Sequence, residues 1–400
     1  MNQRIRLDYR HTIYASYIGY ITQAIVNNFA PLLFLTFQTT YHLTLKDITL
    51  ITTVNFFVQL CVDLLSASFI DRIGYRKAIV SAHMFAAVGL MGLAVFPRIF
   101  SSPYAGLMTA VVLYAIGGGI IEVLISPIVE ACPTARKEAA MSLLHSFYCW
   151  GHVFLVLVST LFFAVFGIKH WPVLACIWGF VPFVNMIYFL FVPLRRTIEE
   201  EKQMNFRALI KQKVFWLLIV IMICAGASEL AMSQWASTFV ESALGVSKTV
   251  GDLTGPCAFA VLMGLARAFY GKCSERIPLK KFMIGCAVLC IGCYALAMLA
   301  EMPLFGLIGC AVCGFSVGIF WPGTFSVAAV KLPAGGTVMY AFLALAGDIG
   351  CSSGPTVVGM VADSTGNNLK LGLGAAMIFP IVILIGLMLL KTDGTAGAID

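Results

Sequence analysis

The sequence predicts an all-α membrane protein of twelve transmembrane helices in two pseudo-symmetric six-helix bundles. Hydrophobic residues make up 60% of the chain and charged residues 11%, which is far outside the range of soluble domains. Apolar runs of about 20 residues, the length that a helix needs to cross a bilayer, recur along the whole chain. A short polar signal also occurs twice, 204 positions apart. These observations exclude a soluble enzyme, and we expect no enzymatic activity.

The repeated signal follows the second predicted span of each half. The first copy reads Asp71-Arg72-Ile73-Gly74-Tyr75-Arg76-Lys77, and the second reads Glu275-Arg276-Ile277-Pro278-Leu279-Lys280-Lys281. Each has an acid, an arginine, an isoleucine, a turn former, one free position and two bases. Upstream, Asp63 and Arg267 stand at equivalent positions. One signal at the same place in two apolar arrays indicates a chain of two related halves.

Twelve spans are predicted at residues 11–38, 46–69, 76–97, 104–130, 138–167, 171–193, 213–240, 249–272, 279–300, 303–330, 336–361 and 369–391. If the N-terminus is cytoplasmic, 20 of the 26 Lys and Arg residues fall in inner segments. Five fall in outer loops, namely Lys46, Arg98, Lys169, Lys248 and Lys370. Because cytoplasmic loops are enriched in Lys and Arg, we expect a multi-pass protein of the cell (inner or plasma) membrane with both termini cytoplasmic.

The longest polar segment, residues 195–213, lies between the sixth and seventh spans. It is predicted to be a cytoplasmic linker between an N-terminal bundle at 1–194 and a C-terminal bundle at 214–400. The net charge of +7 is spread over short clusters between spans, so no nucleic-acid partner is expected. The thirteen cysteines lie mostly inside apolar runs, where they are predicted to pack between helices. No metal or cofactor is expected.

Glycine and proline are placed for close packing and bending in the fourth and tenth spans. Gly117-Gly118-Gly119 in the fourth span, and Gly314 and Gly318 in the tenth, allow neighbouring backbones to approach. Pro127 and Pro322 break helical hydrogen bonds in the same two spans. Backbone groups freed in this way are tolerated only where protein or a water-filled cavity covers them.

This organisation resembles the major facilitator superfamily, whose signal is a small residue, three positions, Asp-Arg, one position, Gly and paired bases. Here the signal stands as Ala67, Asp71, Arg72, Gly74, Arg76 and Lys77, with one extra residue before the bases. The resemblance covers the whole chain. It implies two bundles around a central cavity that opens alternately to each side, and an inner gate braced by Asp71 and its basic partners.

Within that superfamily the chain resembles the fucose permease type of sugar:proton symporters. Gly119-Ile120-Ile121-Glu122 is similar to the fourth helix of that type, in which a glutamate takes the proton. Asn27-Asn28 is similar to its first helix, and Ser142-Leu143-Leu144-His145 is similar to its fifth, where the histidine position often carries a polar sugar contact. One departure is that Pro31 stands where the best-known member has a membrane aspartate.

Five charged residues lie well inside predicted spans, namely Asp63, Glu122, Glu229, Arg267 and Asp348. An ionised side chain at the bilayer centre costs about 3 kcal/mol, so each is expected to have a partner or a function. Glu122 is the first candidate for the proton carrier, because a carboxyl in a partly dry cavity can bind a proton and release it when water arrives. The alternative is a structural carboxyl held by a neighbouring helix. Glu241 and Asp252 lie near span ends and are expected to be wetted.

Glu229 lies in an unusually polar part of the seventh span and is the second candidate for proton coupling. Glu229 and Ser233 share a helix face, and Gln234 and Trp235 follow directly. Carboxylate, amide and aromatic groups together suit a sugar, whose hydroxyls are hydrogen-bonded while its C–H faces stack on a ring. Polar contacts between helices are the alternative.

Asp63, Arg267 and Asp348 are assigned to a gate or to structural pairing. An unpaired buried charge would cost several kcal/mol, so Arg267 is expected to meet Asp348 or a carboxylate of the substrate. Trp321, beside the kink at Pro322, is predicted to face the cavity, with packing against lipid as the alternative.

The sequence therefore predicts a secondary active transporter of a small polar solute, first a sugar, with proton symport. Its expected partners are the solute, protons and the lipid bilayer, and it is expected to be a monomer. The second hypothesis is a proton-coupled exporter of drug-like or amphipathic molecules, which the many Met and Phe residues favour. The third is a non-transporting receptor or scaffold, which predicts no flux and tolerance of Glu122→Gln.

Overall fold

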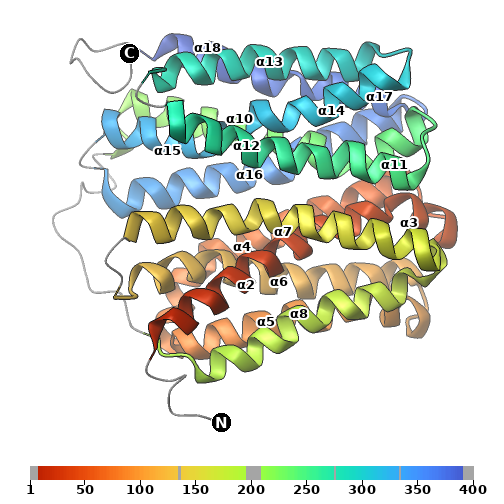
Figure 1. The fold of residues 1–400 in the computed structure, drawn as a ribbon, viewed down its shortest axis with the longest axis horizontal. Helices are drawn as coiled ribbons and strands as arrows, with labels where there is room; N and C mark the ends of the chain where they lie inside the picture. The colour runs from red at the N-terminus through yellow and green to blue at the C-terminus, as the bar shows by residue number, and fades with distance from the viewer. Residues whose placement is uncertain (1–7, 134–136, 195–208, 274–275, 333–334, 391–400) are drawn as a thin grey trace. The chain divides into compact units, whose positions relative to one another are not determined.

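The computed structural model describes residues 8–133, 137–194, 209–273, 276–332 and 335–390 (Figure 1). All regular secondary structure in these residues is helical. Twelve segments among them are long and apolar enough to cross a membrane: Tyr9–Tyr41, Leu45–Leu65, Tyr75–Ile99, Pro103–Val129, Leu143–Phe166, Ile168–Phe191, Lys213–Ala243, Lys248–Tyr270, Leu279–Leu299, Pro303–Lys331, Met339–Ser364 and Leu369–Leu389. The prediction of an all-α protein with twelve spans is confirmed.

The chain forms two compact units, which we call unit 1 and unit 2. Unit 1 contains Met1–Leu43 and Val54–Glu199, and unit 2 contains Thr44–Thr53 and Glu200–Asp400. Most of the predicted linker, residues 195–208, lies outside the described residues, and the first long helix after it begins at Lys213. The boundaries predicted for the linker and the two bundles stay a prediction.

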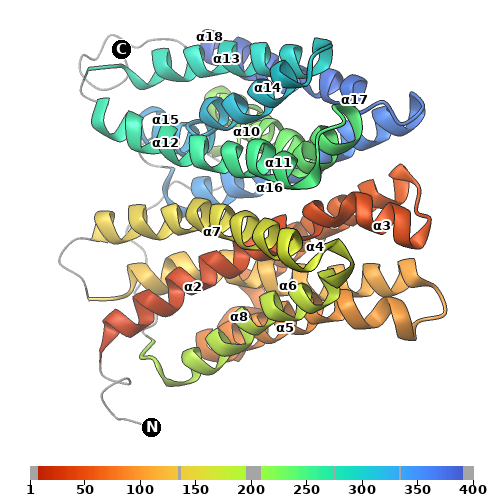
Figure 2. The same cartoon turned by 45° about the vertical axis from the view of Figure 1, so that its right-hand side comes forward.

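Unit 1 is built from the helices of the first six spans. They are α2 (Tyr9–Asn28), η1 (Ala30–Leu33), α3 (Phe34–Tyr41), α4 (Leu45–Ile73), α5 (Tyr75–Ile99), α6 (Pro103–Glu130), α7 (Lys137–Phe166), η2 (Ile168–His170) and α8 (Trp171–Phe191). The helix α5 packs along α6 and α8, and α2 packs against α6, α7 and α8 (Figures 1 and 2). Only the start of α4 groups with unit 2, where the hydroxyl of Thr53 hydrogen-bonds to that of Thr356.

The first span is broken beside two asparagines. Pro31 has no N–H, so it cannot donate the helical hydrogen bond to the carbonyl of Asn27. The α-helix accordingly ends at Asn28, and a 3₁₀ turn over Ala30–Leu33 leads into α3. The side chains of Asn27 and Asn28 therefore lie at the last turn of α2, directly before the break.

Unit 2 is built from the remaining six spans. It contains α10 (Lys213–Thr238), η3 (Phe239–Ala243), α11 (Lys248–Asp252), η4 (Leu253–Cys257), α12 (Ala258–Cys273), α13 (Leu279–Leu299), α14 (Pro303–Val317), α15 (Phe320–Lys331), α16 (Gly336–Ser364), α17 (Leu369–Ala376) and α18 (Ile378–Leu389). The helix α10 packs along α16 and α18, and α14 packs against α12 and α13 (Figures 1 and 2). Both η3 and η4 are π-helical turns.

The glycines that the sequence singled out lie at close helix crossings. A Cβ added at Gly117, Gly118 or Gly119 of α6 would come within 3.0 Å of an atom of α5, α2 or α4, respectively. At Gly314 of α14, it would lie 2.0 Å from the carbonyl oxygen of Phe259 on α12. The predicted close approach of neighbouring backbones is confirmed at Gly117 and Gly314, where the nearest atoms belong to the facing backbone, whereas the atoms nearest to Gly118 are side-chain atoms of Val26 and Gln23.

One base in each copy of the repeated signal caps the last helix of its own half. The guanidinium of Arg76 donates three hydrogen bonds of 2.7–2.8 Å at the C-terminal end of α8, to the carbonyls of Phe189, Leu190 and Val192. Lys280, at the equivalent position, donates from Nζ to the carbonyl of Leu390 directly after α18, at 2.6 Å. A positive charge at a helix C-terminus is favourable, and it satisfies carbonyls that have no donor within the helix.

In the core of unit 1, hydrogen bonds of the Asn185 side chain join α8 to α2 and α5. The side-chain amide of Asn185 on α8 donates to the carbonyl of Ala15 on α2 at 3.0 Å and to Nε2 of His83 on α5 at 2.9 Å. His83 in turn bonds to the carbonyl of Ile79 through Nδ1, at 2.8 Å. Because Nε2 accepts from Asn185, the ring proton of His83 sits on Nδ1.

Candidate functional site

Side-chain hydrogen bonds link three helices of unit 1 through what we call the amide network, formed by Gln23, Asn27, Asn55, Gln59 and Glu122. From α2, Nε2 of Gln23 donates to Oε2 of Glu122 on α6 at 2.8 Å and to Oε1 of Gln59 on α4 at 2.9 Å. Nε2 of Gln59 donates to Oδ1 of Asn27 at 2.8 Å and to Oδ1 of Asn55 at 3.0 Å. Nδ2 of Asn55 also donates to Oδ1 of Asn27, at 3.3 Å.

The spacing of the four amides along the chain explains how they meet. Gln23 and Asn27 are four residues apart on α2, and Asn55 and Gln59 are four residues apart on α4, so each pair shares one helix face. All four side chains are buried, with 2–6% of their surface exposed, whereas Glu122 is half-buried. Buried polar groups are stable only when they are hydrogen-bonded, and the network supplies these bonds.

One acceptor of the network has no donor. Both N–H groups of Gln23 are used, but its Oε1 atom is buried without a hydrogen-bond partner. A Cβ placed on Gly118 would lie 3.0 Å from this oxygen, so the absence of a side chain there makes room for the amide. A buried unsatisfied carbonyl costs about 1–3 kcal/mol, which sets this atom apart from the rest of the network.

Two further predicted substrate contacts lie next to the network, where α2 faces α7. Nδ2 of Asn28 donates to the hydroxyl of Tyr148 on α7 at 3.4 Å. The exposed imidazole of His145 on α7 makes an edge contact with the ring of Tyr20, at a centroid distance of 5.3 Å. The hydroxyl of Tyr20 bonds to Ser126 on α6, at 3.0 Å. The structure thus brings Asn27, Asn28, Glu122 and His145 into one region of unit 1.

Unit 2 contains a different arrangement, in which a carboxylate lies near a guanidinium. Glu229 on α10 is half-buried and close enough to Arg267 on α12 for electrostatic attraction. Nε of Arg267 donates to the carbonyl of Gly318 at 3.1 Å. This carbonyl has lost its helical donor because residue 322 is proline, and the tenth span is divided into α14 and α15 there. The sequence predicted an acidic partner for Arg267 but did not single out Glu229.

The other predicted contacts of the seventh span lie in the packed interior of unit 2. Ser233, Gln234 and Trp235 are 7%, 1% and 0% exposed. The indole N–H of Trp235 donates to the carbonyl of Pro355 on α16 at 2.9 Å. In this arrangement the ring of Trp235 has no exposed surface and its only donor is used, so it offers a solute neither a stacking face nor a hydrogen bond.

Trp321 and two of the predicted gate residues, Asp63 on α4 and Asp348 on α16, are half-buried. The ring of Trp321 packs against Gly347 of α16, where an added Cβ would lie 2.1 Å away. Gly74 has a φ of +83° and separates α4 from α5, and Lys77 is exposed. The side chains of Ala67, Asp71 and Arg72 lie outside the described residues, so the gate stays a prediction.

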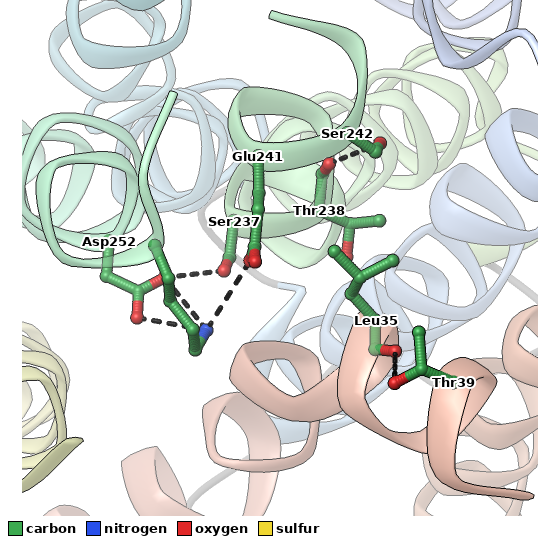
Figure 3. A network of polar contacts seen from close by, with 8 residues as sticks. Leu35, Thr39, Ser237, Thr238, Glu241, Ser242 and Asp252 are labelled. Carbon is green, nitrogen blue, oxygen red and sulfur yellow. Dashed lines mark hydrogen bonds and ion pairs between the residues drawn. The ribbon is translucent and has the colours of Figure 1, made fainter. Parts of the chain in front are cut away.

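An ion network that the sequence did not predict lies where α10 ends and α11 begins (Figure 3). Nζ of Lys248 lies 3.1 Å from Oδ2 of Asp252 and 3.9 Å from Oε2 of Glu241, and the hydroxyl of Ser237 donates to Oδ1 of Asp252 at 2.5 Å. Asp252 is only 1% exposed, so the expectation that it is wetted was wrong. The two π-helical turns place this acid against α10 rather than toward the loop.

The described part of the chain contains no group of three or more His, Cys, Asp and Glu side chains that could hold a metal ion.

Comparison with known proteins gives one family and a shared fold. Residues 16–355 match the model of the Major Facilitator Superfamily, and no curated protein matches the chain. A bacterial homologue of the human lysosomal transporter Spinster matches with a TM-score of 0.73 and 14% identity, over 95% of this chain and 96% of that one. A variant of the E. coli fucose:proton symporter FucP matches with a TM-score of 0.63 and 16% identity, over 95% of this chain and 98% of that one. A variant of the nucleoside transporter NupG matches with a TM-score of 0.74 and 14% identity, over 94% of this chain and 99% of that one. At these identities the likeness shows the fold.

Proposed function

Because the chain belongs to the major facilitator superfamily, and is therefore a multi-pass membrane transporter, we propose that it moves a small polar solute by alternating access with proton symport. The observation that carries this proposal is the setting of Glu122. Its carboxylate is half-buried and accepts a hydrogen bond from the neutral amide of Gln23, at 2.8 Å. This amide leads into a set of buried polar side chains on two other helices of the same unit.

A carboxyl held by an amide can change its protonation state without leaving a bare charge behind. An amide has both a donor and an acceptor, so it can bond to the carboxylate or to the neutral acid. Glu229 differs, because protonating it would leave the guanidinium of Arg267 without its neighbouring anion. We therefore assign the exchanged proton to Glu122, and we assign Glu229 to holding Arg267 in place.

The class of solute follows from the groups around Glu122. The half-buried carboxyl of Glu122 and the exposed imidazole of His145 can each donate or accept hydrogen bonds, which is what a polyhydroxylated molecule requires. Asn27 and Asn28 beside them are buried, and both side-chain N–H groups of Asn28 are already used. The fold is also that of a fucose:proton symporter, a nucleoside transporter and a D-xylose–proton symporter, whose names refer to sugars or sugar-containing solutes. A monosaccharide is accordingly the first candidate. From the distribution of Lys and Arg, we also place both termini in the cytoplasm.

The proposal is tested in proteoliposomes with an acidic exterior and radiolabelled fucose or xylose outside. If one proton accompanies each solute, a gradient of one pH unit supports about tenfold accumulation, since one unit is worth about 1.4 kcal/mol. Glu122→Gln should reduce the accumulation ratio to one while exchange of labelled for unlabelled sugar continues. Glu301→Gln, which changes an exposed acid, is the matched control and should accumulate sugar normally.

Two results would contradict the proposal. Accumulation that persists in Glu122→Gln, or that survives a protonophore, would remove Glu122 from proton coupling. Proton-driven extrusion of amphipathic cations, with no sugar uptake, would instead favour the exporter.

A further inference from the structure

We propose that Gln23 and Gln59 form a relay that transmits the protonation state of Glu122 to Asn27 by reversing the side-chain amides in turn. The relay deepens the proposed function, because it rests on Glu122 being the proton site. Gln23 and Gln59 are then positioning residues, and Asn27 is the buried end of the relay.

With Glu122 ionised, every amide has one orientation. The carboxylate accepts from Gln23, which also donates to Gln59. Gln59 then has only its N–H groups left for Asn27 and Asn55, so both asparagines turn their carbonyl oxygens toward it. The side-chain N–H groups of Asn27 therefore point away from Gln59.

A proton on Glu122 reverses this order. The carboxyl becomes a donor and needs an acceptor, and the unsatisfied Oε1 of Gln23 becomes that acceptor when the amide turns over. The oxygen of Gln23 then faces Gln59, which must turn its own N–H groups toward it. The oxygen of Gln59 now faces Asn27, so Asn27 reverses and turns its N–H groups toward Gln59.

The relay needs little movement. Each reversal is a rotation about one terminal bond, and the oxygen and nitrogen of an amide occupy nearly the same space. Gly118 leaves room beside the Gln23 amide, because any Cβ there would lie 3.0 Å from Oε1. Reversal gives the Gln23 oxygen, which lacks a donor in the ionised state, the proton of Glu122, and it moves the Gln23 N–H groups to the side of Gly118.

Other titratable side chains lie on the helices packed against α6. Tyr20 on α2 lies near enough to Glu122 to interact with it electrostatically. Asp63 on α4 is one turn from Gln59, His83 on α5 is held by Asn185, and His145 and Tyr148 lie on α7. A pH titration of the protein therefore has to be compared with the same titration of Glu122→Gln, which removes only the contribution of Glu122.

The test is infrared difference spectroscopy of the full chain in lipid vesicles during a pH titration, with asparagine labelled by ¹³C at the side-chain carbonyl. In the unmodified protein, the Glu122 carboxylic acid band should appear together with a shift of the labelled asparagine band. Glu122→Gln should remove both changes. Gln23→Met should keep the acid band and lose the asparagine shift, and Gln59→Met, which breaks the next link, should do the same. Gln38→Met on α3 is the matched control and should keep both.

A Glu122 acid band without any asparagine shift would overturn the relay, as would a shift that survives in Gln23→Met and Gln59→Met. These outcomes leave the proton site itself intact. Conversely, the Glu122 acid band and the asparagine shift could appear together in a protein that accumulates no sugar in proteoliposomes. That result would contradict the proposed function and would still support the relay.

Discussion

Replacing Arg267 by methionine should destabilise unit 2, and replacing Pro322 by alanine in the same chain should restore part of the loss. The reason is a single carbonyl. The oxygen of Gly318 has no helical donor because residue 322 is proline, and Nε of Arg267 takes that place at 3.1 Å. An N–H at position 322 can reach the same oxygen, since Ile319 in between keeps right-handed helical torsions, with φ −95° and ψ −15°.

The magnitudes follow from the two kinds of hydrogen bond. A bond from a charged donor contributes about 1.5–3 kcal/mol, so Arg267→Met should lower the free energy of unfolding by at least that range. A neutral helical bond contributes about 0.5–1.5 kcal/mol, which is the part that Pro322→Ala should return. The electrostatic attraction between Arg267 and Glu229 is lost in both backgrounds, and it therefore cancels when the costs are compared.

The assay is reversible unfolding in mixed detergent micelles for the unmodified protein, the two single variants and the double variant. The double variant should be more stable than the sum of the single changes predicts, by about 1 kcal/mol. Pro127→Ala, which removes a proline from α6 of unit 1, is the control and should be additive with Arg267→Met. If Arg267→Met and Pro322→Ala are additive within about 0.5 kcal/mol, the two residues do not share the Gly318 carbonyl and the reasoning is refuted.

Three further predictions use the same unfolding measurement. Arg76→Gln should lower the free energy of unfolding by about 1–3 kcal/mol, because the carbonyls at the end of α8 lose their donors. Lys77→Gln, at the exposed neighbour, should change it by no more than about 0.5 kcal/mol. Equal losses in the two variants would argue against the cap. Gly314→Ala should lower the free energy of unfolding by about 1–3 kcal/mol, because its Cβ would meet a backbone oxygen 2.0 Å away. Gly285→Ala is the control and should leave the free energy of unfolding nearly unchanged, because its Cβ would meet nothing within 4 Å. Asn185→Leu should cost about 1–3 kcal/mol because buried acceptors on α2 and α5 lose their donor; an unchanged stability would show that water replaces it.

The spans and their close crossings could be predicted because they depend on properties that a sequence displays directly. Run length gives the number of spans, and glycine or proline within a run marks where backbones meet or bend. The break at Pro31 and the crossing at Gly314 both follow from local chemistry, and neither requires knowledge of which helix lies opposite.

The amide network was only half predicted, because a helix sequence does not say which faces converge. Asn27 was singled out by resemblance and Glu122 both by resemblance and by its charge inside a span, but Gln23, Asn55 and Gln59 were missed. The signal that was available is spacing: two pairs of amides, each four residues apart, on two apolar helices. Pairs of this kind place two donors and two acceptors on one face, and such a face must be covered by other polar groups in a membrane.

The partners of charged residues were harder still, because they depend on helix rotation and on irregular turns. Arg267 interacts with Glu229 and Gly318, which lie on two other elements, and nothing in the local sequence couples the three positions. Asp252 was assigned to water from its place near the end of a span. The π-helical turns on either side of the α10–α11 corner bury it against Ser237 and Lys248 instead.

The repeat itself supplies an argument that the network in unit 1 serves more than packing. Counting 204 positions onward, Asn55 and Gln59 of α4 correspond to Phe259 and Met263 of α12. Both pairs lie at a close crossing, where glycines of α6 approach Gln59, Gly314 of α14 approaches Phe259, and Gly318 directly after α14 approaches Met263. Unit 2 thus fills the equivalent crossing with apolar side chains, which need no hydrogen-bond partners. Since burying amides is costly unless they are hydrogen-bonded, this contrast supports the proposed role of the amide network beside Glu122 over a need to join two helices.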